Sequence, residues 1–179
     1  MISRYSVLLK YFALVFLLFA GLECTKTDEE VLFKMEYDQY LAVPAGLNTI
    51  ETYSFILKDL STNYKTLLGT FNVSDSTIKA IKPGSIRLAD ELNQLDFSKI
   101  EKISLLVSKP NFQTELEIGY LETVPLTSTS VLQLFPTLVN AKDILSGTTF
   151  NLKLKVKLRS FLTSNTNIRL RFTMNTFSK

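Results

Sequence analysis

The sequence contains no histidine, and this absence removes several kinds of chemistry. Histidine is the usual general base near neutral pH and the commonest protein ligand for metal ions. The chain also has a single cysteine, so it can form neither an internal disulfide nor a cysteine-rich zinc site. These absences exclude serine–histidine hydrolases, cysteine–histidine proteases and most zinc enzymes. We predict a protein that is not an enzyme, has no catalytic or metal-binding residues and needs no cofactor.

What the chain does contain is typical of one folded domain. Hydrophobic residues make up 46% of its 179 residues and charged residues make up 21%. A chain of this length accommodates a targeting segment followed by one domain. The formal net charge of +3 is too small to indicate nucleic-acid binding, and we expect no nucleic-acid partner.

The first 23 residues have the layout of a secretory signal peptide. Arg4 and Lys10 precede a short uncharged run at residues 11–21 (YFALVFLLFAG). A membrane-spanning helix needs about 20 apolar residues, and this run reaches that length only by including Lys10. We therefore interpret residues 1–23 as a lipoprotein signal peptide, with an uncleaved short N-terminal anchor as the alternative.

The only cysteine of the chain, Cys24, follows this run directly. The segment AGLEC resembles a bacterial lipobox, although Glu23 stands where Gly, Ala or Ser is usual and Gly21 stands where Leu is usual. Residues 25–30 (TKTDEE) resemble the surface-export signal of Bacteroidetes lipoproteins, and they would also form a solvated acidic linker. The resemblance implies that Cys24 is lipidated, that residues 24–30 are a tether, and that the exported protein is anchored in the outer membrane or at the cell surface. An incidental cysteine near a cleavage site is the alternative.

Residues 31–179 alternate hydrophobic and polar side chains with a period of two, which indicates β-strands. The pattern predicts an antiparallel β-sandwich of about eight strands with Ig-like, Greek-key connections, and a lipocalin-like barrel is the alternative. Pro83 and Gly84 indicate that residues 74–89 form an edge strand, or a bend between two short strands. One short helix is expected within residues 136–145. The remaining predicted strands cover residues 31–40, 49–58, 66–72 (weaker), 100–108, 114–123, 131–135, 151–159 and 168–174.

Two hairpins are predicted from strands that follow one another closely. Residues 100–108 should pair with residues 114–123 across the turn KPNFQ. Residues 151–159 should pair with residues 168–174 across the turn TSNTN, with one face of the hairpin in the core.

Basic side chains alternate along the second of these hairpins. If they point the same way, they form a face for an anionic partner such as lipid headgroups, lipopolysaccharide or acidic polysaccharide. A solvated strand face, partly neutralised by cross-strand carboxylates and guarding a sheet edge, is the alternative. The residues of this predicted face are Lys153, Lys155, Lys157, Arg159, Arg169 and Arg171.

The body of the chain resembles small all-β lipoproteins of Bacteroidetes in three segments. These are VPAGLNTIETYSFIL (residues 43–57), KPGSIRL (residues 82–88) and the closing pair LKLKVKLRS and IRLRF. The resemblance brings no known activity with it. Our hypothesis is a non-catalytic interaction or structural module with a protein or glycan partner. The alternative is a lipoprotein that holds an apolar small ligand, or a glycan, in its β domain.

Overall fold

A computed structural model describes residues 30–90, 95–111, 113–127 and 129–178 of the chain. Cys24, the predicted signal peptide and residues 25–29 of the tether lie outside the described residues. The elements of the described chain are β1 (Val31–Val43), β2 (Thr52–Ser61), α2 (Tyr64–Phe71), the 3-10 turn η1 (Asp75–Thr77), β3 (Ile78–Asp90), the 3-10 turn η2 (Phe97–Lys99), β4 (Ile100–Ser108), β5 (Glu115–Leu121), β6 (Val131–Pro136), α3 (Lys142–Leu145), β7 (Thr149–Leu158) and β8 (Thr166–Ser178).

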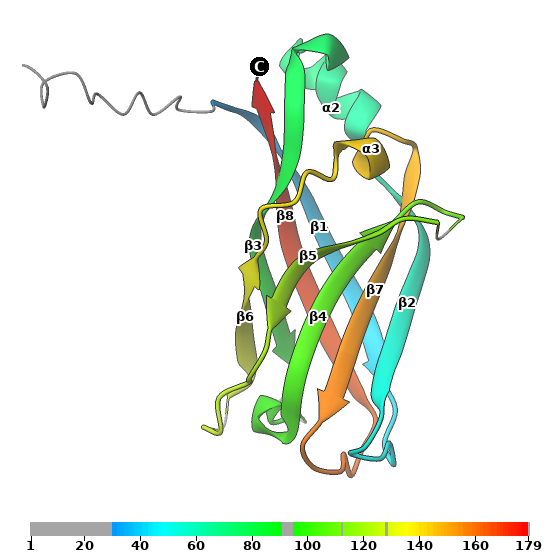
Figure 1. The fold of residues 1–179 in the computed structure, drawn as a ribbon, viewed down its shortest axis with the longest axis vertical. Coiled ribbons are helices and arrows are strands. Elements are labelled where there is room, and N and C mark those ends of the chain that lie inside the picture. The colour runs from blue at the N-terminus through cyan, green and yellow to red at the C-terminus, as the bar shows by residue number, and fades with distance from the viewer. Residues whose placement is uncertain (1–29, 91–94, 112, 128, 179) are drawn as a thin grey trace, which may run out of the picture.

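The eight strands form one antiparallel sheet in the order β1-β8-β3-β6-β5-β4-β7-β2. The first strand pairs with the last, the second with the seventh, the third with the sixth and the fourth with the fifth. This nested pairing is jelly-roll connectivity, which contains two Greek keys. In Figure 1, β2, β7, β4 and β5 (half B) lie in front of β1, β8, β3 and β6 (half A).

The sheet curls into a nearly closed barrel, so the fold is more barrel-like than the predicted sandwich. All-β structure, antiparallel pairing and eight strands are confirmed. Half A and half B stay joined because β5 pairs with β6, where Gly119 lies opposite Pro136 and Tyr120 opposite Phe135. Gly119 permits this join, since a Cβ at its position would overlap the side chain of Ile86 on β3.

The prediction of a hairpin between residues 151–159 and 168–174 is wrong. β7 lies between β2 and β4, whereas β8 lies between β1 and β3 in the other half of the barrel. Alternation along a strand shows that one face is buried, but it does not identify the neighbouring strand. The hairpin of residues 100–108 with residues 114–123 is confirmed as the antiparallel pair β4–β5.

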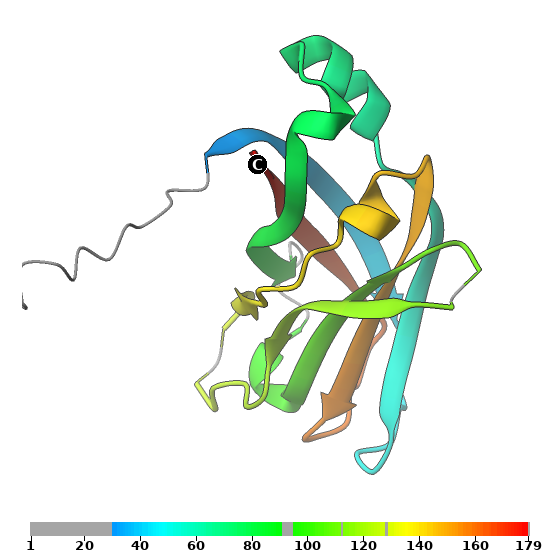
Figure 2. The same cartoon turned by 45° about the horizontal axis from the view of Figure 1, so that its top comes forward.

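The weak strand predicted at residues 66–72 is also wrong, because residues 66–71 lie in α2 and Asn72 caps its end. Asn63 and Asn72, both with left-handed backbone angles, flank the helix, and its first residue, Tyr64, is buried. The predicted short helix after β6 is confirmed as α3. Figure 2 shows α2 and α3 at the same end of the barrel, where β8 ends.

Pro83 lies inside β3, whose two halves have different neighbours. β8 pairs with β3 along its length, but β6 pairs only with Ile86–Ala89. Pro83 therefore occupies the part of β3 that has one partner, as expected for a residue that cannot donate to a ladder. The register shifts between Pro83 and Ile86, so the predicted bend is present although β3 is not an edge strand of the sheet.

Side chains from both halves meet in one hydrophobic core. Tyr37 of β1 stacks on Phe172 of β8 with ring centroids 4.7 Å apart, and meets Phe150 of β7 edge-on at 5.1 Å. These three rings therefore connect half A to half B. None of the helices among the described residues has the length and apolar character needed to cross a membrane.

Candidate functional site

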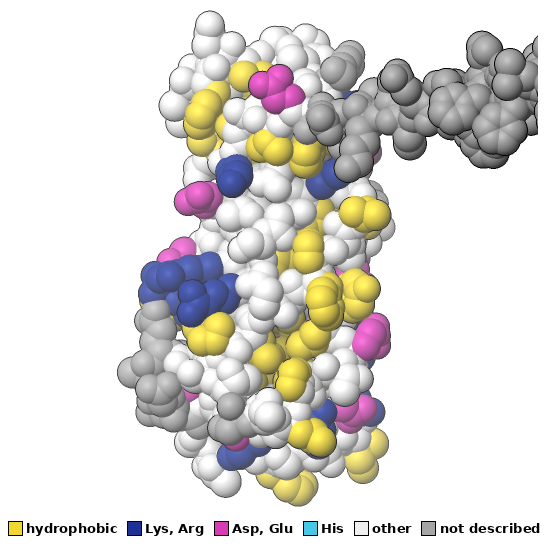
Figure 3. Space-filling model, turned by 90° about the vertical axis from the view of Figure 1, so that its left-hand side faces the viewer, with side chains coloured by type: hydrophobic (Ala, Val, Ile, Leu, Met, Phe, Trp, Pro, Cys, Tyr) yellow, Lys and Arg dark blue, Asp and Glu magenta, His cyan; other side chains and the backbone are white. Residues whose placement is uncertain are grey.

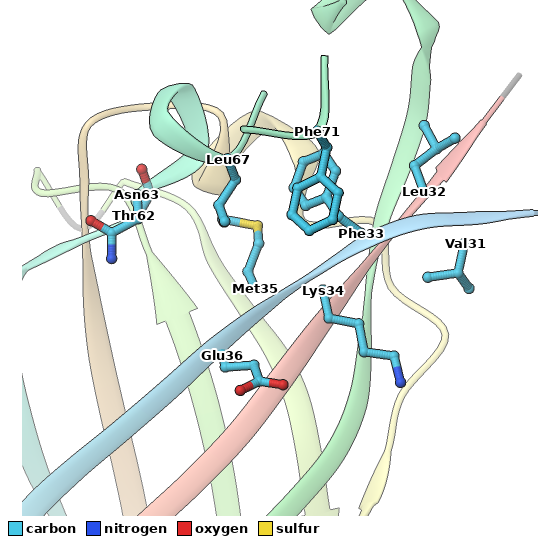
Figure 4. Close-up of a pocket in the computed structure, with 10 residues that line it drawn as sticks. All are labelled: Val31, Leu32, Phe33, Lys34, Met35, Glu36, Thr62, Asn63, Leu67 and Phe71. Carbon is cyan, nitrogen blue, oxygen red and sulfur yellow. The ribbon is translucent and has the colours of Figure 1, made fainter. Parts of the chain in front are cut away.

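In the strand order of the described residues, the barrel opens along a seam between β1 and β2. Each of these strands pairs with a single neighbour, β8 for β1 and β7 for β2, so each has an unpaired edge. A groove of about 620 Å³ opens along the first part of β1, beside α2 and the end of β2. Its lining is shown in Figure 4 and consists of Val31, Leu32, Phe33, Lys34, Met35, Glu36, Thr62, Asn63, Leu67 and Phe71.

The apolar wall of this groove is built where α2 packs over β1. Phe33 stacks on Phe71 with ring centroids 5.3 Å apart and an interplanar angle of 13°. Figure 4 shows Leu67 of the helix directed toward Met35, with Lys34 and Glu36 on the other side of the strand. Phe33 and Met35 are buried, whereas Phe71 is 49% exposed. The groove therefore presents apolar surface to solvent at the rim of the core.

The backbone of β1 contributes hydrogen-bonding groups to the same groove. Phe33 directs its backbone toward β8, because its N–H donates to Thr176 Oγ1 at 3.0 Å and its carbonyl accepts from the same hydroxyl at 2.8 Å. Successive residues of a strand direct these groups to opposite sides. Lys34 and Glu36 therefore direct their N–H and C=O groups away from β8, to the unpaired edge.

Tyr37 closes the seam just beyond the groove. Its hydroxyl donates to the backbone carbonyl of Thr62 at 3.0 Å, and burial raises the pKa of this phenol above its usual range. Thr62 is itself held to the segment before β7, because its N–H donates to the Thr148 carbonyl at 3.0 Å and its hydroxyl to the Gly147 carbonyl at 2.6 Å. The Tyr37–Thr62 hydrogen bond therefore bridges the seam, and the groove is the part of the seam that stays open beside this bridge.

The predicted basic face is divided by the fold. Lys153, Lys155 and Lys157 lie on β7 in half B, and Arg169 and Arg171 lie on β8 in half A. The β7 lysines form ion pairs with neighbouring carboxylates at two positions. Lys153 pairs with Glu115, and Lys157 pairs with Glu101 at 2.9 Å.

Arg159, the last member of the predicted face, connects loops. Its guanidinium donates to the backbone carbonyls of Ser98 at 2.5 Å and Val124 at 2.9 Å. These carbonyls belong to η2 and to the segment after β5, so the side chain joins three parts of one barrel end. A structural role accounts for it.

The two β8 arginines converge on one carboxylate of β1. Arg169 donates to Asp38 at 2.5 and 2.8 Å, and Arg171 donates to it at 3.2 Å. The Arg169 hydrogen bond is the main cause that lowers the pKa of Asp38. Arg87 of β3 lies opposite Arg171 in the register, a neighbour that the sequence pattern does not indicate. Knowledge of the strand order would have been needed to find it.

A second hollow, of about 330 Å³, lies beside these charges on the outer face of half A. Its lining residues come from β1, β3 and β8 and are Glu36, Tyr37, Asp38, Ser85, Arg171, Phe172 and Thr173. The described residues contain no group of three or more Cys, Asp or Glu side chains that could hold a metal ion.

Fold and site together define a jelly-roll domain with an open strand edge beside an apolar groove. No protein-family model, curated protein or solved structure matches the chain.

Proposed function

We propose that this protein is a non-catalytic interaction module that binds an extended polypeptide segment along the unpaired edge of β1. One observation carries the proposal. The largest of the hollows described above lies against the part of β1 where Lys34 and Glu36 offer unpaired backbone groups.

The added segment would bind as a further strand of the sheet. Its backbone would exchange hydrogen bonds with Lys34 and Glu36, and alternate side chains would enter the apolar groove beside Leu67 and Phe71. The intervening side chains would lie on the side of β1 that carries Lys34 and Glu36. A segment with alternating apolar and charged residues fits this arrangement.

A proline substitution tests the backbone contribution. Lys34→Pro removes an N–H group that makes no ladder bond with β8, and proline is tolerated on edge strands. The matched control, Lys34→Ala, removes the same side chain and retains the N–H. We expect peptides selected from a random display library on the full-length protein to lose most of their affinity for Lys34→Pro and little for Lys34→Ala. Equal affinities for the two variants would refute strand addition.

The apolar lining favours a second candidate, a small apolar ligand. Such a ligand would contact Phe71, Leu67 and Met35 but would need no backbone N–H. With 1-anilinonaphthalene-8-sulfonate as the fluorescent probe, this candidate predicts that Phe71→Ala weakens binding and that Lys34→Pro does not. A peptide that displaces the probe would show that both ligands use the groove.

We further propose that lipid on Cys24 holds this module at the outer membrane or the cell surface. The groove begins at Val31, so the six residues between it and Cys24 could extend about 20 Å at most. The groove would then lie at the membrane-proximal end of the barrel. Mass spectrometry of the mature protein tests this directly, with Cys24→Ser as the unlipidated control. An unmodified Cys24, or one still preceded by residues 1–23, would contradict the anchor.

A further inference from the structure

The outer face of half A carries a row of charges that the jelly-roll register assembles from three strands. Asp38 of β1 lies opposite Arg171 of β8, and Arg171 lies opposite Arg87 of β3. One step along the strands, Tyr40 lies opposite Arg169. Arg87, Arg169 and Arg171, which we name the arginine row, therefore lie on adjacent strands of one face.

This arrangement leaves the arginine row with excess positive charge. Asp38 accepts hydrogen bonds from both Arg169 and Arg171. Arg87 is exposed and forms no ion pair with a carboxylate among the described residues. Like charges that face each other across a ladder disfavour the sheet, so a bound anion would stabilise this pairing. Arg171 retains 50% side-chain exposure while it contacts Asp38, so its guanidinium is open to a ligand.

The hollow beside the row offers polar groups of a different kind. Its lining includes Ser85 and Thr173 together with Glu36 and Asp38. Thr173 Oγ1 accepts from the Ser85 N–H at 3.0 Å, a close approach that needs Gly84, since a Cβ there would lie 2.5 Å from Thr173 Oγ1. Hydroxyls and carboxylates next to guanidiniums suit a ligand that carries both hydroxyl and acid groups.

We propose that the arginine row binds the acid groups of a carboxylated or sulfated polysaccharide, with an adjoining sugar in the hollow. Guanidinium groups bind carboxylate and sulfate through paired hydrogen bonds. The carboxylates of Glu36 and Asp38 can accept hydrogen bonds from the hydroxyls of the adjoining sugar. Figure 3 shows a dense group of Lys and Arg side chains at one margin of the face that β3 and β6 occupy. The exposed ring of Tyr40, with Arg169 5.5 Å from its centroid, extends the surface beyond the row.

The test measures binding of the full-length protein to polygalacturonate (carboxylated), heparin (sulfated), dextran (neutral) and phosphatidylglycerol vesicles. We expect at least one of the two acidic polysaccharides to bind and dextran not to bind. Arg87→Gln should weaken that binding about tenfold or more. Arg87→Lys should weaken it less, because it keeps the charge and loses the paired geometry.

Lys155→Gln is the matched control, because it removes one positive charge from the outer face of half B. It should change affinity by less than about twofold. Thermal unfolding without ligand supplies a second readout. Arg87→Gln should leave the melting temperature unchanged or raise it, because it removes the repulsion between Arg87 and Arg171. A loss of binding in this variant would then not be caused by unfolding.

Two outcomes would overturn the proposal. In the first, neither acidic polysaccharide binds, and Arg87-dependent binding of phosphatidylglycerol vesicles would then assign the row to a lipid headgroup. In the second, Arg87→Gln and Lys155→Gln weaken polysaccharide binding equally. The inference is independent of the peptide site. Lys34→Pro should leave polysaccharide binding intact, so the two proposals fail separately.

Discussion

At the residue scale, the side chains that the sequence marks as a functional face have separate partners in the structure. Lys153 and Lys157 pair with carboxylates of strand neighbours, and Arg159 donates to loop carbonyls. Arg169 and Arg171 share one carboxylate, that of Asp38. The role of these charges therefore depends on side chains and carbonyls from adjacent strands and loops, and not on the residues next to them in sequence.

Asp38 should make stability depend on acid pH. Its pKa is lowered in the folded protein, mainly by the Arg169 hydrogen bond, so the carboxylate contributes stability above its unfolded pKa of about 3.9. That contribution is lost as pH falls through the lowered folded pKa. Asp38→Asn should cost less than about 1 kcal/mol at neutral pH, because the pair is solvent-screened. Urea unfolding across pH should show the difference shrinking in acid, and a constant difference would contradict this account.

Tyr37→Phe should weaken the bridged part of the seam. The substitution keeps the ring contacts with Phe150 and Phe172 and removes the hydrogen bond to the Thr62 carbonyl. Loss of a buried hydrogen bond costs about 1 kcal/mol in the free energy of unfolding. Urea denaturation measures this cost, and Tyr53→Phe is a control for a phenol that bonds only to the adjacent loop, at Asn48 N–H.

At the element scale, tertiary packing outweighs local preference at two points. The segment that contains Leu67 and Leu68 is as apolar as a short strand, but it forms α2 because those leucines and Tyr64 pack on the core. β5 and β6 depend on Gly119, where the sheet passes from half B to half A. We therefore expect alanine substitutions at Gly69 of α2 and at Gly119 of β5 to change the stability of the protein in opposite directions.

Gly119→Ala should destabilise the protein, whereas Gly69→Ala should stabilise it. A Cβ at Gly119 overlaps buried Ile86, and such overpacking costs about 1–3 kcal/mol. A Cβ at Gly69 meets nothing within 4 Å and removes a helix-interior glycine, which should contribute about 0.5–1 kcal/mol. Thermal unfolding of both variants measures the two shifts. A Gly119→Ala variant that is as stable as the unsubstituted protein would show that the join is not tightly packed.

At the scale of the whole molecule, the jelly roll brings the first and last described strands together. Phe33 of β1 bonds to Thr176 of β8 across 143 residues of sequence. This nested pairing leaves β1 and β2 as the two unpaired edges, and the groove lies where they diverge. The proposed peptide site and the proposed polysaccharide site both depend on β1, which contributes its edge to one and its outer face to the other.

Folding should be slow for a domain of this size. Most strand partners are far apart in sequence, and loop-closure entropy must be overcome before those contacts form. We expect refolding in milliseconds to seconds or slower, measured by stopped-flow fluorescence of the tyrosines. Refolding in microseconds would indicate that local pairs such as β4–β5 dominate the rate.

The sequence by itself determined the class of fold and the limits on chemistry. Period-two alternation specified strands, since successive side chains of a strand point to opposite faces, and the β4–β5 hairpin followed from a short turn. The lack of histidine and the single cysteine likewise exclude histidine-dependent catalysis and a cysteine-rich zinc site directly from the sequence.

Only the tertiary structure decided which strands are neighbours. Alternation is the same whether β8 pairs with β7 or with β1 and β3, so the sequence could not separate Lys155 from Arg171 or bring Arg87 beside Arg171. The groove likewise depends on where α2 packs and on where the barrel stays open. These features arise from contacts between residues distant in sequence, and local patterns carry no information about such contacts.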